Sequence, residues 1–345
     1  MRWNARDVEA VEAITMATPD ISTATAEATP SPATLVAGEL SRVEARVREL
    51  SASREPQLQA IGQGLIEAGG KRVRPALALL VFRACGGENP SDTIEVGAAL
   101  ELIHSATLLH DDILDSGQTR RGRPSPLAVH GPSLTLVAGD FLFSKAFGVA
   151  GRFDAEVVGW ATDACISLCE GEIMQQRFRR NPAVTEADYL EIADRKTAAL
   201  FAEAARIGAK FAGAPEPVIA AMRGLGREIG MAFQMVDDLL DVLGPAEVIG
   251  KPVGSDLREG SPALPTVLAL PRLPEVARTF ADPAPTPERV SLAIAALRSS
   301  TVLPEVRQKA RERIARAFGH LERLAPSPYQ AALTELVAEM HARTA

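Results

Sequence analysis

Hydrophobic and polar residues follow a helical period along most of the chain. In the stretch 97–115, GAALELIHSATLLHDDILD, apolar residues recur every three or four positions without an interrupting proline. This pattern predicts a long, largely buried helix. Further helices are predicted at 35–50, at 56–69, from Pro75, at 133–150, 155–180, 186–213 and 225–243, and beyond residue 263. No segment alternates with the period of a β-strand, so the fold class is predicted to be all-α.

Two of these predicted helices carry a DDxxD motif near their ends, at 111–115 and 237–241. Carboxylates four residues apart project from one face of a helix, and no Lys or Arg stands four residues from the first pair. Like charges at this spacing oppose the helix by a few tenths of a kcal/mol, and a hard cation such as Mg²⁺ would offset them. An acidic exposed helix end is the alternative for either copy alone, whereas two copies in matched apolar contexts favour metal. The six carboxylates are Asp111, Asp112, Asp115, Asp237, Asp238 and Asp241.

Basic residues stand close to both motifs in the sequence. Lys71 and Arg74 stand just before Pro75, at the start of a predicted helix. The helix dipole would favour a bound phosphate there. A solvated basic turn is the alternative. The loop SGQTRRGRPS places Arg120 and Arg121 just after the first carboxylates, which suits a metal-bridged diphosphate, although a surface salt bridge would use the same residues.

Composition limits the remaining possibilities. The net charge of −7 argues against a nucleic-acid partner. The three cysteines cannot all pair and form no CxxC motif, which fits a reducing, cytoplasmic location. No uninterrupted apolar run is long enough to span a membrane, so no transmembrane segment is predicted. Residues 1–34 are predicted to be a disordered leader, because Thr, Ala and Pro dominate 17–34, and residues 35–345 a single domain.

An ordered set of motifs, GGKRVRP, LLHDDILDSGQTRRGRPS, GDFLF, KTAALF, FQMVDDLLD and GKPVGSDLREG, resembles the trans-isoprenyl diphosphate synthases of the polyprenyl synthetase family. The resemblance covers roughly residues 40–345. It implies one large helical bundle around a deep cavity, usually a homodimer, which condenses isopentenyl diphosphate head-to-tail onto an allylic diphosphate. It also implies about three Mg²⁺ ions per active site, with Mn²⁺ as a substitute, and contact with a membrane surface for product release.

The resemblance assigns roles to individual residues. The six aspartates of the two motifs would hold the metal ions. Arg120, Lys196, Gln234 and Lys251 would contact the allylic diphosphate, with Thr197 beside Lys196. Lys71, Arg74, His104 and Arg121 would hold isopentenyl diphosphate.

The chain departs from the family pattern at two places. Ser261 stands where many members have Lys, so one frequent phosphate contact is missing. Ser125 follows Pro124, where Thr is common. Neither change removes a predicted metal ligand, so activity is expected.

Product length is expected to depend on residues below the metal site. Ala106 and Thr107 lie roughly 6 to 8 Å down the predicted helix from Asp111, and both are small. With Ile103, Phe141 and Phe143 as further candidates for the pocket wall, the hypothesis is an open tunnel. Its product would be long, about C30 to C50; farnesyl or geranylgeranyl diphosphate is the alternative.

Three other functions use part of the same pattern. A class I terpene cyclase shares the helical fold and an acidic motif, but it needs no isopentenyl diphosphate site. An HD-type phosphohydrolase would need more histidines than the five present. An inactive partner subunit or prenyl-lipid binding protein would not need two intact DDxxD motifs.

Overall fold

The computed structural model describes residues 32–67, 69–70, 72–120, 123–244 and 253–342. The part from Pro32 onward is one unit. Residues 1–31 of the predicted leader lie outside the described residues, whereas 32–34 belong to a short helix, α2 (Pro32–Leu35). The first helix therefore begins three residues before the predicted start of the domain.

Helices make up most of the described chain and strands almost none of it, which confirms the all-α fold class. They are α3 (Ala37–Leu50), α4 (Pro56–Glu67), α5 (Val73–Ala84), α6 (Ser91–Leu114), α7 (Pro126–Ala150), α8 (Ala155–Phe178), α9 (Glu186–Ala193), η2 (Asp194–Ala198), α10 (Ala199–Phe211), α11 (Glu216–Leu243), α13 (Ser255–Glu259), α14 (Leu264–Ala269), α15 (Pro274–Ala281), α16 (Pro287–Arg298), α17 (Val302–Leu321) and α18 (Pro328–Ala342). Two antiparallel strands, β1 (Thr119–Arg120) and β2 (Arg123–Pro124), follow α6. Each is too short for hydrophobic periodicity to predict.

The helix ends follow local sequence signals. Pro75 lies in the first turn of α5, and Gly244 directly follows α11. α7 begins earlier than predicted and is kinked where Gly131, at φ 77°, precedes Pro132. The apolar period after Pro132 therefore predicts only the second part of this helix.

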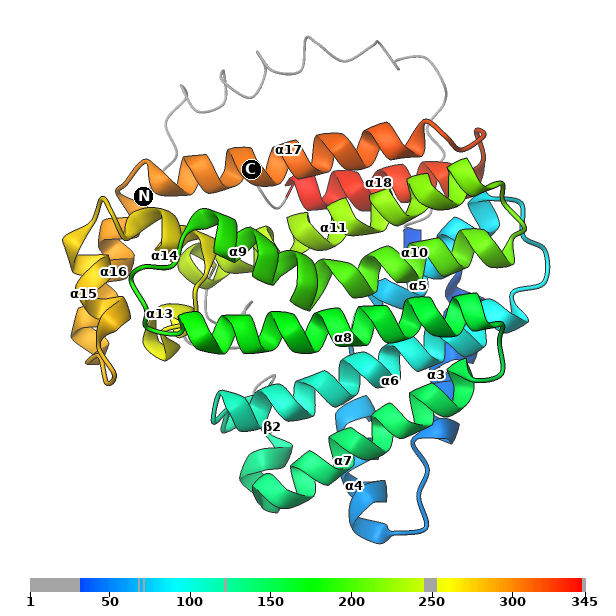
Figure 1. Cartoon of the computed structure of the whole chain (residues 1–345), viewed down its shortest axis with the longest axis horizontal. Helices are drawn as coiled ribbons and strands as arrows, with labels where there is room; N and C mark the ends of the chain where they lie inside the picture. Colours follow the sequence, from blue (N-terminus) through cyan, green and yellow to red (C-terminus); the bar gives the residue numbers. More distant parts are fainter. Residues whose placement is uncertain (1–31, 68, 71, 121–122, 245–252, 343–345) are drawn as a thin grey trace. The chain divides into compact units, whose positions relative to one another are not determined.

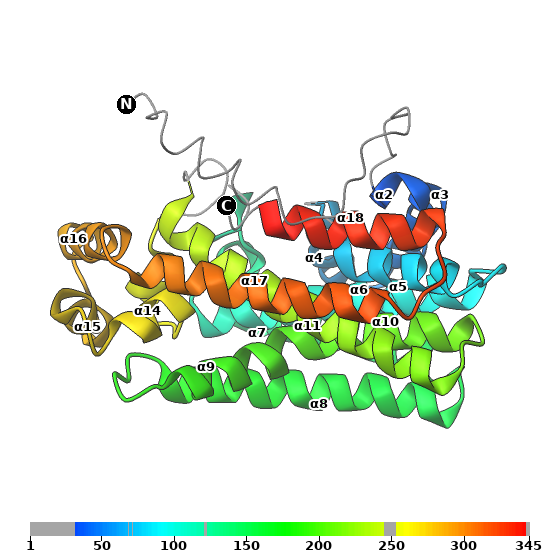
Figure 2. The same ribbon diagram turned by 90° about the horizontal axis from the view of Figure 1, so that it is seen from above.

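The two helices that carry the acidic motifs, α6 and α11, pack into one bundle with their neighbours. α6 packs against α5 and α7, while α10 packs against α5 and α11. Figures 1 and 2 show α8, α11 and α17 running lengthwise, with α15 and α16 together at one end. α10 can approach α5 this closely because it has glycine at position 208, where a Cβ atom would lie 2.4 Å from the carbonyl oxygen of Ala78.

A π-helical turn interrupts the predicted helix 186–213. This turn, η2, carries Lys196 and Thr197, and its extra residue per turn changes the direction of the side chains that follow. α8 lies against it so closely that a Cβ atom on Gly171 would be 2.7 Å from the backbone nitrogen of Lys196. Such turns are frequent at functional sites.

α7 is the one helix of the described residues that is long and apolar enough to cross a membrane. Its mean hydropathy reaches 1.3, and 39% of the apolar window is buried inside the fold. Length and composition alone are weak evidence, because the core helix of a soluble protein has the same properties. α7 packs along α6 and α4.

Candidate active site

A pocket of about 310 Å³ lies between α6, α8, η2 and α11. Its wall combines carboxylates from both DDxxD motifs with cationic side chains and apolar residues. The acidic residues that line it are Asp111, Asp115, Asp237, Asp238, Asp256 and Glu259, and the basic ones are Arg74, His104 and Lys196. The structure therefore brings the two distant motifs to a single pocket.

The first motif lies at the C-terminal end of α6. Asp111 and Asp115 line the pocket, and Asp115 is the C-terminal cap of the helix. Asp112 is buried and does not belong to the pocket lining. Because the C-terminal end of a helix carries partial negative charge, the helix dipole adds to the repulsion between these carboxylates.

The second motif lies at the C-terminal end of α11, and its third carboxylate points elsewhere. Asp237 and Asp238 line the pocket. Asp241 is buried, and its Oδ1 accepts hydrogen bonds from the backbone nitrogen of Ser255, at 3.1 Å, and from the Ser255 hydroxyl, at 2.6 Å. Its Oδ2 accepts from the nitrogen of Asp256 at 3.3 Å. Asp241 thus holds the start of α13, and its role as a metal ligand stays a prediction.

Asp238 is a buried acid of the pocket whose pKa is strongly shifted. Burial raises its pKa to about 7. Hydrogen bonds from the backbone nitrogen of Leu264 and the amide of Gln234, both at 2.9 Å, and the nearby Tyr189 hydroxyl oppose this rise. Gln234 in turn accepts a hydrogen bond from the Thr197 hydroxyl at 2.8 Å. A carboxylate this costly to ionise without a cation suits a metal site.

Lys196 faces the first motif from η2. It forms an ion pair with Glu172 of α8, and its Nζ lies 4.0 Å from Asp111 Oδ1. Burial lowers the pKa of Lys196, but the negative charges of Asp111 and Glu172 raise it by more. The net pKa therefore lies above its ordinary value. The ammonium therefore stays charged at the pocket wall.

The residues predicted to hold isopentenyl diphosphate are only partly described. Arg74 and His104 line the pocket. The guanidinium of Arg74 lies 4.5 Å from the centre of the Phe201 ring, and burial lowers the pKa of Arg74 to about 10. Its buried Nε has no hydrogen-bond partner, as expected of a group that receives an anionic ligand. Lys71, Arg121 and Lys251 lie outside the described residues, and only the backbone of Arg120 is described.

The candidate chain-length residues separate into two groups. Thr107 lines the pocket one turn below Asp111, together with Leu108, Leu168, Leu200 and Phe233. The others do not line this pocket. Ile103 and Ala106 are buried in the core, and Phe141 and Phe143 pack partly buried against it.

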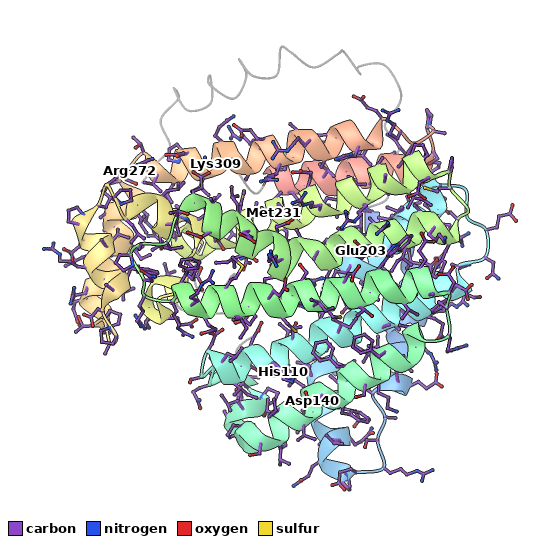
Figure 3. The ribbon with its side chains drawn as sticks, viewed as in Figure 1. His110, Asp140, Glu203, Met231, Arg272 and Lys309 are labelled. Carbon is purple, nitrogen blue, oxygen red and sulfur yellow. The ribbon has the colours of Figure 1, made fainter. Side chains whose placement is uncertain are left out.

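His110 is turned away from the pocket. Its Nε2 lies 3.2 Å from the carbonyl oxygen of Leu136 and 3.4 Å from Asp140 Oδ1. Figure 3 shows His110 and Asp140 together where α6 meets α7. His110 therefore takes no part in an HD-type metal centre at this pocket.

Sequence reasoning did not single out Tyr189 and Glu259, which also line the pocket. Tyr189 lies on α9, which η2 directly follows, seven residues before Lys196. Glu259 belongs to the motif GKPVGSDLREG, but the resemblance assigned it no role.

The carboxylates fit a divalent cation only if another ligand completes its coordination. Among the described residues, no three His, Cys, Asp or Glu side chains come close enough to hold a metal by themselves. Mg²⁺ typically takes one or two carboxylates and fills its other positions with water and phosphate oxygens. Two facing acidic motifs with cations beside them fit a metal shared with a diphosphate.

Comparison with known proteins places these features in context. Residues 55–288 match the family described as Polyprenyl synthetase. The chain is 45% identical over 236 residues to a short chain isoprenyl diphosphate synthase of Methanothermobacter thermautotrophicus, which covers 67% of this chain and 72% of that protein. It is 33% identical over 307 residues to an octaprenyl diphosphate synthase of Escherichia coli, covering 88% and 95%. A polyprenyl synthase of Caulobacter crescentus, solved with calcium and isoprenyl diphosphate, has a TM-score of 0.86 at 31% identity, covering 91% and 97%.

The raised pKa of Asp238 predicts how pH affects the metal-free protein. Because the folded pKa of about 7 exceeds the ordinary 3.8, the stability contributed by the protonated carboxyl is lost as the pH rises through about 7. Asp238→Asn should therefore raise the Tm measured in EDTA more at pH 8 than at pH 5.5. Asp163→Asn, at an exposed position, is the control. An equal effect of Asp238→Asn at both pH values would contradict the prediction.

Proposed function

The chain belongs to the polyprenyl synthetase family, and from this premise we propose that it uses Mg²⁺ to make a long all-trans polyprenyl diphosphate. It is a trans-isoprenyl diphosphate synthase, a prenyltransferase that acts on isoprenyl diphosphates. The observation that carries the proposal is the convergence of both acidic motifs and Lys196 on one pocket.

The pocket suits the condensation of an allylic diphosphate with isopentenyl diphosphate. The C1–O bond of the allylic substrate breaks, and the diphosphate leaves with the electron pair. Divalent metal, when bound by Asp111, Asp115, Asp237 and Asp238, would neutralise negative charge on the leaving diphosphate. Lys196 adds a fixed positive charge on the same side.

The second substrate must then lie beside the allylic cation. Arg74 and His104 line the pocket and would hold isopentenyl diphosphate there. The double bond of isopentenyl diphosphate attacks C1 to form the new carbon–carbon bond. Loss of a proton, which the released diphosphate accepts, restores a double bond. None of these steps needs a nucleophile from the protein.

We propose Mg²⁺ as the metal, in about three copies per site with Mn²⁺ as a substitute, because hard cations prefer carboxylate and phosphate oxygens. The proposed product is roughly C30 to C50, since Thr107 is small where it lines the pocket below Asp111.

Exposed apolar side chains support a homodimer. Val129, Leu136, Val137 and Phe147 of α7 and Ile166 and Ile173 of α8 are all more than a third exposed. α7 and α8 contact each other, and large apolar side chains exposed on neighbouring helices are typical of an interaction surface. We propose that a second copy of the chain covers this apolar surface.

We also propose that the protein is cytoplasmic and that the product leaves at a membrane surface.

The proposed reaction predicts a product ladder. Purified protein with labelled isopentenyl diphosphate, farnesyl diphosphate and Mg²⁺ should give prenyl diphosphates above C25, whereas EDTA should abolish incorporation because the carboxylates then repel the substrate. The products are sized after dephosphorylation. Arrest at C15 or C20 would keep the reaction but reject the long product, and cyclic hydrocarbon would indicate a terpene cyclase.

The chain-length proposal predicts that bulk at position 107 shortens the product. Thr107→Phe would place a ring in the pocket below Asp111, so the longest product should lose one or more C5 units. Thr107→Val, of similar volume, is the matched control. Products of wild-type length from a Thr107→Phe protein with an unchanged Tm would refute this tunnel.

The dimer proposal predicts a mass in solution of about twice the 36.6 kDa of one chain, measured by sedimentation equilibrium. Val137→Glu should shift the protein toward the monomer, because it places a charge on the apolar surface of α7. Leu292→Glu, at an equally exposed position on α16, should not. A monomeric wild type would contradict the proposal.

A further inference from the structure

Arg179 directly follows α8 and joins two sides of the pocket. Its Nη1 donates to Asp115 Oδ1 at 3.0 Å, and its Nε donates to the carbonyl oxygen of Glu259 at 2.8 Å. Asp115 ends the first acidic motif, whereas Glu259 is the last residue of α13, which follows the second motif. Both residues line the pocket. The guanidinium of Arg179 therefore connects the first acidic motif to α13, which follows the second motif.

A row of polar side chains on α8 links Arg179 to Lys196. Gln176 accepts from Arg179 Nη1 at 3.4 Å and donates to Glu172 Oε1 at 3.0 Å. Glu172 is paired with Lys196, which faces Asp111. Each end of the first acidic motif is therefore held by a cation, and α8 fixes both cations relative to each other.

Arg180, the next residue, anchors this part of the backbone to α13. The backbone nitrogen of Arg180 donates to the carbonyl oxygen of Gly260 at 2.9 Å, and its Nη2 donates to that of Arg258 at 2.8 Å. Arg180 adopts this position with φ at 56°, a conformation that residues other than glycine rarely take. The backbone at 179–180 is thus held against α13, which limits how far the guanidinium can move.

We propose that Arg179 is a positioning residue that orients the Asp115 carboxylate toward a divalent cation and holds α13 against it. The proposal rests on the proposed function, since it concerns the same metal and diphosphate site. Donors that hydrogen-bond a ligating carboxylate fix its direction and tune its affinity for metal. A planar guanidinium can serve Asp115 and Glu259 at once, which a lysine ammonium does with poorer geometry.

The test is a Mg²⁺ titration of Arg179→Gln with two readouts. The first is the Tm in the presence of inorganic diphosphate, which needs no turnover, and the second is the condensation rate. The half-saturating Mg²⁺ concentration should rise about tenfold in both, while the rate at saturating Mg²⁺ should stay within about threefold of wild type. Arg177→Gln is the matched control, because Arg177 is exposed and lies over the Phe178 ring. It should titrate like the wild type.

Two further variants separate positioning from a purely structural role. Arg179→Lys should recover part of the lost Mg²⁺ affinity. If Arg179 acts through Asp115, the effects of Arg179→Gln and Asp115→Asn on Mg²⁺ affinity should not add in the double variant. Additive effects would overturn the proposal. So would a lower Tm of metal-free Arg179→Gln with an unchanged Mg²⁺ midpoint.

The same measurements distinguish this proposal from the proposed function. If Mg²⁺ with diphosphate changes the Tm of the wild type but no product forms, the proposed function is rejected. The Tm titration of Arg179→Gln then still tests the role of Arg179. If neither Mg²⁺ nor diphosphate changes the Tm of the wild type, both the proposed function and the role of Arg179 are overturned.

Discussion

Electrostatic repulsion among clustered carboxylates is the constraint on which the site depends. Both acidic motifs stand at the C-terminal ends of long helices, where the helix dipole adds to their negative charge. The fold offsets part of this cost with Lys196, Arg179 and the backbone nitrogen of Leu264. Burial still raises the pKa of Asp238 to about 7, and a bound cation would lower this cost of ionising the carboxyl. Affinity for such a ligand is therefore built into the placement of the helices.

Hydrophobic periodicity predicted the long helices and placed both acidic motifs on them, because these properties are local to the sequence. It could not predict the π-helical turn that carries Lys196, since inserting one residue into a helix leaves almost no trace in the apolar pattern. It also could not distinguish Asp241 from Asp237. Only the packing of α13 shows that Asp241 accepts hydrogen bonds from Ser255. Roles that depend on residues far apart in the chain have to be read from the structure.

The lining of the pocket combines two kinds of side chain. Carboxylates and cations make up part of it, whereas Leu168, Leu200 and Phe233 contribute apolar wall. Substitution among apolar residues of different volume leaves the carboxylates and cations in place. The relatives of this chain are likewise named for different products, a short chain isoprenyl diphosphate synthase and an octaprenyl diphosphate synthase among them.

Hydrogen bonds at the end of α11 hold both ends of the connection that follows this helix. The nitrogen of Gly244 donates to the carbonyl oxygen of Leu240, and the nitrogen of Gly254 donates to that of Asp241, the next residue. Both ends of the connection between α11 and α13 are thus tied to the same helical turn. Because the entropy of closing a loop grows only slowly with its length, a change in the number of residues between 244 and 254 would cost little stability. It would instead change the position of Lys251, the predicted diphosphate contact in this connection, relative to the carboxylates of α11.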